Sequence, residues 1–75
     1  MLLSDSEVGK KYRISNIDKL GRNIKKRLCD MGLVGCVFLV IVKSSGPVLV
    51  EVRGTRLALG RGMAMKLEVE EVIGE

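Results

Sequence analysis

The segment CVFLVIVKSSGPVLVEVRGTRLAL, residues 36–59, decides the fold. Residues 36–42 are almost wholly apolar and rich in β-branched side chains, which favours a central strand buried on both faces. The SSGP sequence at 44–47 favours a turn, because proline fixes φ near the value that a turn requires. Residues 48–53 carry valine at every second position, and residues 55–59 alternate again with leucine facing inward. The segment therefore predicts three strands joined by tight turns.

Residues 22–31 carry the one clear helical pattern in the sequence. Three apolar side chains recur at helical spacing and form a single stripe: Ile24, Leu28 and Met31. Gly32 follows, and a glycine just past the end of a helix can adopt the left-handed conformation that ends it. Leu33 can then fold back onto Leu28, so we expect a Schellman ending here.

The remaining segments complete a small, mainly β fold. Residues 10–17 are expected to form the first strand, residues 60–66 a short helical turn and residues 67–70 the last strand. Short strands at close spacing favour a barrel of about five strands, because a barrel hides its edges by closing on itself. The helix lies between the first two strands and across an open end or side of the barrel. Six side chains are expected to fill it: Val37, Val40, Val50, Leu57, Leu59 and Val69.

The length and the apolar runs limit the class of protein. At 75 residues the chain is expected to form a single domain over residues 1–75. Its longest apolar run, residues 34–42, has nine residues, whereas a membrane-spanning helix needs about 20. The first residues lack the basic region and long apolar core of a signal peptide. We therefore predict a cytoplasmic protein with no direct membrane insertion.

The glycines and arginines of residues 53–65 invite comparison with a phosphate-binding loop. A P-loop has four residues between its glycines, followed by Lys-Ser/Thr. Here five residues separate Gly54 from Gly60, and Arg-Gly follows. A dinucleotide fingerprint would begin at Gly60, but Met65 stands where its third glycine belongs. We therefore interpret this stretch as a strand and a turn.

The residue types present argue against an enzyme. The chain has no histidine, so the commonest general base and metal ligand is missing, and its carboxylates are scattered or clustered in the last strand. Cys29 and Cys36 have six residues between them and form no CxxC motif. We expect both thiols to be buried as small hydrophobes, although they are the only soft ligands and so weak candidates for metal binding. We predict no catalytic residue and no cofactor.

The basic residues are concentrated in the middle of the chain. The net charge is +4, and all thirteen basic residues lie between Lys10 and Lys66, where only three acidic residues oppose them. Such a stretch attracts acidic partners of any kind. Barrels that bind single-stranded nucleic acid stack bases on exposed aromatic rings. Tyr12 and Phe38 are the only aromatic residues, and both fall in apolar strand patterns, so we expect no nucleic-acid partner. A small basic barrel that binds nucleic acid through charge alone stays as an alternative.

Two stretches of the sequence resemble the signatures of the FeoA family. RLCDMGLVGCVFLVIV, residues 27–42, is similar to the family pattern R-L-x-x-L-G-L-x-x-G-x-x-V-x-V. VEVRGTRLALGRGMA, residues 50–64, resembles the second pattern, V-x-V-x-G-x-x-L-A-L-R-x-x-x-A. The similarity extends from Val8 to Val69. It departs at the loop before the second strand, which is one residue shorter, and at Arg61, which stands one place later.

The resemblance implies an SH3-like barrel and a role in bacterial ferrous iron uptake. The expected protein is a cytoplasmic accessory that binds the membrane permease FeoB through its cytosolic GTP-binding region and so regulates transport. Exposed basic side chains on the helix and around the Gly54 turn are the expected partner-binding residues: Arg22, Lys25, Lys26, Arg53, Arg56 and Arg61. An SH3-like regulatory module that serves an iron-dependent transcriptional repressor is an alternative, because the same barrel occurs in those repressors.

Overall fold

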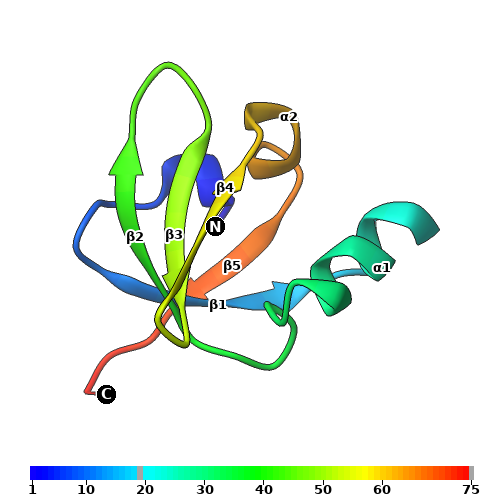
Figure 1. Ribbon diagram of the computed structural model, residues 1–75, viewed down its shortest axis with the longest axis horizontal. Coiled ribbons are helices and arrows are strands. Elements are labelled where there is room, and N and C mark those ends of the chain that lie inside the picture. The colour runs from blue at the N-terminus through cyan, green and yellow to red at the C-terminus, as the bar shows by residue number, and fades with distance from the viewer. Residues whose placement is uncertain (19, 75) are drawn as a thin grey trace.

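The protein is described here by a computed structural model that covers residues 1–18 and 20–74. Its helices are the 3₁₀ helix η1 (Leu3–Asp5), α1 (Arg22–Asp30) and α2 (Arg61–Ala64). Its strands are β1 (Lys11–Asn16), β2 (Phe38–Lys43), β3 (Val48–Val52), β4 (Thr55–Leu59) and β5 (Glu68–Glu71). Figure 1 shows α1 beside the strands and α2 between β4 and β5. No helix within the described residues is both long and apolar enough to cross a membrane.

The five strands form one antiparallel sheet in the order β4-β3-β2-β1-β5. The predicted mainly β fold, with five strands and a helix between the first two, is confirmed. The predicted closure is wrong, because no pairing joins β4 to β5 among the described residues. These two strands are connected through α2 instead of a tight turn, so the chain passes from one edge of the sheet to the other without bonding them.

The hairpin of β3 and β4 has the tight turn that the sequence predicts. Val52 pairs with Thr55, which leaves Arg53 and Gly54 as a two-residue turn. Both have positive φ, 53° and 78°, as a type I′ turn requires. Glycine adopts a positive φ without strain. Arg53 carries a Cβ atom, which makes the same conformation unfavourable for it.

The end of α1 also follows the prediction. The Leu33 N–H donates to the Leu28 carbonyl oxygen at 3.1 Å, and the Gly32 N–H donates to the Cys29 carbonyl oxygen at 3.0 Å. Gly32 has a φ of 76°, so these are the paired bonds of a Schellman motif. Leu28 and Leu33 are both buried, which fixes the direction in which the chain leaves the helix.

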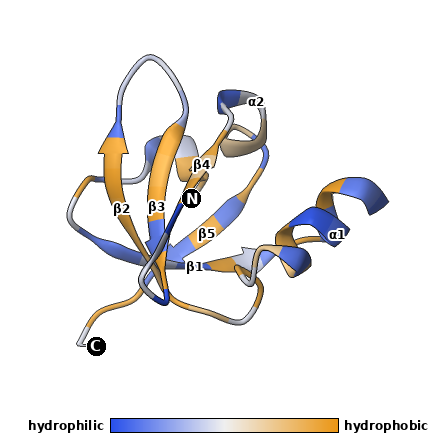
Figure 2. Cartoon of the chain, in the orientation of Figure 1, coloured by the Kyte–Doolittle hydropathy of each residue, from blue (hydrophilic) through white to orange (hydrophobic). Residues whose placement is uncertain are grey.

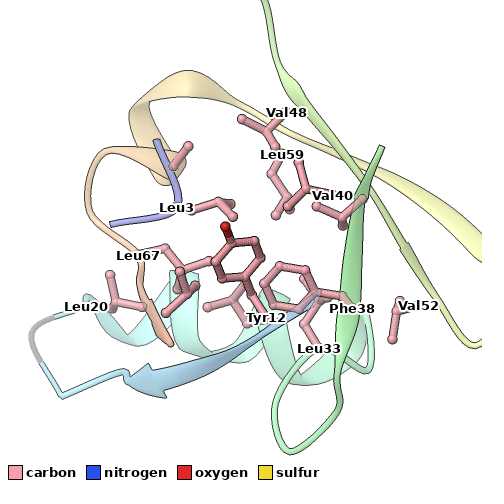
Figure 3. Packing of buried hydrophobic residues seen from close by; sticks show 14 residues of the cluster. Leu3, Tyr12, Leu20, Leu33, Phe38, Val40, Val48, Val52, Leu59 and Leu67 are labelled. Carbon is pink, nitrogen blue, oxygen red and sulfur yellow. The ribbon is translucent and has the colours of Figure 1, made fainter. Parts of the chain in front are cut away.

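Tyr12 and Phe38 occupy the centre of the core, with ring centroids 6.5 Å apart (Figure 3). In Figure 2 the apolar colouring is most continuous along β2 and β3, whereas α1 carries polar and apolar residues together. Of the six side chains expected inside, four are buried: Val40, Val50, Leu59 and Val69. Leu57 is half-buried, and Val37 is 38% exposed. The expectation for Val37 is wrong because side chains alternate along a strand and its neighbour Phe38 takes the inward position.

The N-terminal segment covers the outer side of β5. The Val69 N–H donates to the Met1 carbonyl oxygen at 2.7 Å, and the Leu3 N–H donates to the Leu67 carbonyl oxygen at 2.8 Å. The Leu3 side chain is fully buried in the core. The segment is also tied to the core ring, because the Glu7 N–H donates to the Tyr12 hydroxyl at 2.8 Å.

Candidate functional site

A groove of about 340 Å³ separates α1 from the end of β4 and from α2. Its floor and walls are largely apolar: Ile24, Met31, Ala58, Leu59 and Met63. Arg27 and Lys66 are the charged residues among the described lining, and both are exposed. The groove therefore combines apolar surface with positive charge, which suits binding of another molecule more than acid–base chemistry.

The way that α1 packs leaves this apolar surface accessible. Leu28 is the only fully buried residue of the helix, whereas Ile24 and Met31 of the same stripe are half-buried. The helix is anchored by Leu28 together with Leu20 and Leu33, which flank it in the sequence. Because the sheet covers one part of the stripe only, the rest of it lines the groove.

None of the six predicted partner-binding residues lines the groove. Arg22 and Lys26 are exposed on α1 and Lys25 is half-buried there, while Arg53 and Arg56 lie on the hairpin of β3 and β4. That these residues contact a partner stays a prediction.

The three arginines beyond α1 have partners within the chain. Arg53 Nη2 donates to Cys36 Sγ at 2.8 Å, and Arg56 Nε lies 3.7 Å from Glu51 Oε2. Arg61 Nη1 donates to the Ser45 carbonyl oxygen at 2.8 Å. Arg61 therefore points to the turn between β2 and β3, where it lines a separate cavity of about 70 Å³.

The sequence analysis missed the two cations of the groove. Arg27 follows Ile24 by three residues and precedes Met31 by four, so helical spacing places it beside the apolar stripe. That spacing could have identified Arg27 from the sequence. Lys66 has no such local signal, because only the tertiary fold brings it next to α1. Neither residue forms an ion pair with any described residue.

The two cysteines are placed differently from expectation. Cys29 is exposed and Cys36 is half-buried, so the interpretation of both as buried hydrophobes is wrong. Leu28 takes the inward position on α1, and the 100° step to the next residue turns Cys29 toward solvent. No cluster of three or more metal-binding side chains occurs within residues 1–18 and 20–74.

Two basic residues on the β1 and β5 side of the sheet, Lys10 and Arg13, form ion pairs. Lys10 Nζ lies 2.8 Å from Glu7 Oε2 and 3.9 Å from Glu71 Oε1, and Arg13 pairs with Glu70. The hydrogen bond and the positive charge of Lys10 lower the pKa of Glu7, and the same contact raises the pKa of Lys10. Acidic partners are thus supplied within the chain on this side, whereas no acidic side chain is among the described residues that line the groove.

Residues 1–71 match the sequence model of the family described as "FeoA domain". The chain belongs to the FeoA family. A relative described as "Putative Fe(2+) transport protein A", from Methanocaldococcus jannaschii, is 36% identical over 70 residues, which cover 92% of this chain and 84% of the relative.

Solved structures of FeoA proteins have the same fold. A crystal structure described as "Iron Uptake Regulatory Protein (FeoA)" is 32% identical, with a TM-score of 0.82 over 96% of this chain and 97% of the other. The solution structure of the FeoA protein from Chlorobium tepidum is 26% identical, with a TM-score of 0.84 over 100% of this chain and 73% of the other. The family that the two sequence signatures indicate is therefore confirmed.

Proposed function

We propose that this FeoA protein is a non-enzymatic accessory of ferrous iron transport that acts in the cytoplasm. It binds a FeoB-like membrane permease through the permease's cytosolic GTP-binding region and thereby regulates transport. Membership of the FeoA family and the name of the curated relative support the link to ferrous iron transport.

The observation that carries the binding role is the groove beside α1. Its apolar floor is accessible and its charged rim, Arg27 and Lys66, is unpaired among the described residues. Protein interfaces combine a desolvated apolar centre with a polar rim, and positive charge at the rim speeds encounter with an acidic surface. The groove has both features.

The nucleic-acid alternative loses support from the positions of the aromatic rings. Tyr12 and Phe38 are each 1% exposed, and the chain has no other aromatic residue. A surface for stacking bases is therefore missing. Binding through charge alone would collapse as salt increases, so an oligonucleotide titration at two salt concentrations tests this alternative directly.

The proposal is tested by titrating the isotopically labelled protein with the purified cytosolic domain of the permease. We expect saturable changes in amide chemical shift at groove residues such as Ile24, Arg27 and Met63, and weaker affinity at higher salt. The ion-paired residues Arg13 and Glu70 serve as the internal control, because they lie on β1 and β5. Absence of any change at low salt, with the permease domain in excess, would contradict the proposal.

A further inference from the structure

Strand β4 is an edge of the sheet that no other described segment covers. It pairs with β3 alone and stands at one end of the strand order. At the other end, residues 1–3 lie along the β5 side through backbone hydrogen bonds. An uncovered edge presents unpaired backbone N–H and C=O groups, which another extended segment can bind.

The register identifies the outward-facing groups of β4. Val52 and Thr55 flank a two-residue turn and so form a hydrogen-bonded pair. Thr55 and every second residue after it therefore exchange hydrogen bonds with β3. The N–H and C=O groups of Arg56 and Ala58 point away from the sheet, where an added strand would meet them.

The groove lies directly beside this edge. Ala58 and Leu59 belong both to β4 and to the lining of the groove, and α1 supplies Ile24 and Met31 on the opposite wall. Side chains alternate along a strand, so a segment paired with β4 places every second side chain over this apolar surface. Backbone pairing and apolar burial thus coincide at one place.

The charges around the edge select the kind of segment. Arg27 and Lys66 line the groove, and no acidic residue occurs among its described lining. Arg56 lies on the edge itself, where its Nε is 3.7 Å from Glu51 Oε2 of β3. A second copy of the chain paired through β4 would bring the same cations together, and like charges oppose such pairing. An acidic segment is complementary to the two unpaired cations, Arg27 and Lys66.

We propose that β4 binds an extended acidic segment of a partner protein, which adds to the sheet as a further strand. Apolar side chains of this segment enter the groove, and its carboxylates lie near Arg27 and Lys66. The identity of the partner as an iron permease rests on the proposed function, whereas the binding surface and its chemistry do not.

Amide hydrogen exchange of the unmodified protein tests the pairing. The first probe is a synthetic blocked peptide of alternating glutamate and valine, and its control replaces each glutamate by lysine. The second probe is the cytosolic domain of the permease. Exchange at the outward amides of Arg56 and Ala58 is expected to slow at least about tenfold at saturation, since a bound amide must open before it exchanges. The inward amide of Leu57 is the reference.

Two variants separate backbone pairing from charge attraction. Ala58→Pro removes an outward N–H without removing a bond to β3, and proline is tolerated at such edge positions. Ala58→Ser keeps the N–H and is the matched control. We expect the proline variant to bind the acidic probe roughly tenfold more weakly, and the serine variant to bind within about twofold of the parent protein. The exchange measurement decides the question if the proline variant does not fold.

Each outcome has a defined meaning. Slower exchange at Arg56 and Ala58 with the acidic peptide or with the permease domain supports the proposal, and unchanged exchange with both overturns it. The proposal is also overturned if the protein without any probe has twice the expected mass in solution and exchanges the Arg56 and Ala58 amides as slowly as the Leu57 amide. A second copy of the chain would then cover β4. If the permease domain binds without slowing these amides, this inference fails for that partner while the proposed function stands. If only the peptide binds, the proposed function fails and the surface stands.

Discussion

The two edges of the sheet differ in whether another segment of the chain covers them. The β5 edge is covered by the N-terminal segment, which buries Leu3 and bonds its backbone to Leu67 and Val69. The β4 edge has no such cover among the described residues and carries an exposed Arg56 instead. A charged side chain discourages unspecific pairing without removing the backbone groups that a chosen partner can use. One edge therefore contributes to stability, and the other stays available for binding.

Truncating the cover of β5 is expected to have the largest effect. Leu3→Ala removes a fully buried side chain and should lower the free energy of unfolding by about 2–5 kcal/mol. Urea denaturation followed by circular dichroism measures the change. Val8→Ala is the control, because Val8 is 54% exposed and its truncation should change the free energy by no more than about 0.5 kcal/mol. Equal losses in the two variants would show that the segment does not stabilise the sheet.

The position of α1, which forms one wall of the groove, depends on Gly32, the left-handed residue that follows the helix. Gly32→Ala places a side chain at a φ of 76° and should cost about 1–2 kcal/mol of unfolding free energy. Gly62→Ala is the matched control, because this glycine lies in α2, has no positive φ and leaves open space for a methyl group. Thermal melts of both variants measure the change, and the control should have an unchanged or slightly higher unfolding free energy. A neutral Gly32→Ala would contradict the Schellman ending.

The charges that line the groove beside β4 are expected to affect binding more than folding. Replacing Arg27 and Lys66 together by glutamine should weaken affinity for the acidic peptide about fivefold, since exposed ion pairs each contribute less than about 1 kcal/mol. The matched control replaces Arg22 and Lys26, which are exposed on α1 outside the groove. Isothermal titration calorimetry at low salt measures the affinity of each double variant for the acidic peptide. A larger loss in the control would place the partner on the part of α1 that carries Arg22, Lys25 and Lys26, which are three of the six predicted partner-binding residues.

The smallest effect concerns the ion pair on the covered side. The lowered pKa of Glu7 stabilises the folded protein at pH values above the ordinary glutamate pKa, and this contribution disappears as the pH falls through the lowered value. Lys10 has the opposite sign, because its raised pKa contributes below the ordinary lysine pKa and the contribution disappears as the pH rises through the raised value. In Lys10→Gln, an NMR titration should show the pKa of the Glu7 carboxyl raised toward the ordinary glutamate value, because Lys10 is the main cause of the lowering and Lys43 a smaller one. An unchanged titration would show that another group sets the pKa.

Local patterns predicted the parts of the fold that local physics determines. The hairpin of β3 and β4 follows from alternating side chains and a turn at Gly54, and the end of α1 follows from Gly32 and the leucine after it. Closure of the barrel was predicted from short strands at close spacing, but it depends on where α2 carries the chain. That direction is a tertiary property, which strand periodicity does not contain.

The candidate site was less accessible from the sequence. Ile24 and Met31 follow the spacing of a core stripe, and the sheet covers them only in part because α1 lies beside it. Charge and exposure predict the six basic residues as a binding surface, whereas the groove is defined by the apolar side chains that lie next to Arg27 and Lys66. Two ordered signatures in the sequence indicate the family, but contacts between distant residues locate the groove.

The bond from the Glu7 N–H to the Tyr12 hydroxyl makes the protein a natural spectroscopic reporter of its own N-terminal segment. The chain has one tyrosine and no tryptophan, so its near-ultraviolet circular dichroism arises mainly from this ring. Release of the segment breaks the bond to the ring and changes that signal, while the far-ultraviolet spectrum still records the strands. Detachment of the segment can therefore be followed separately from unfolding of the sheet, without an added label.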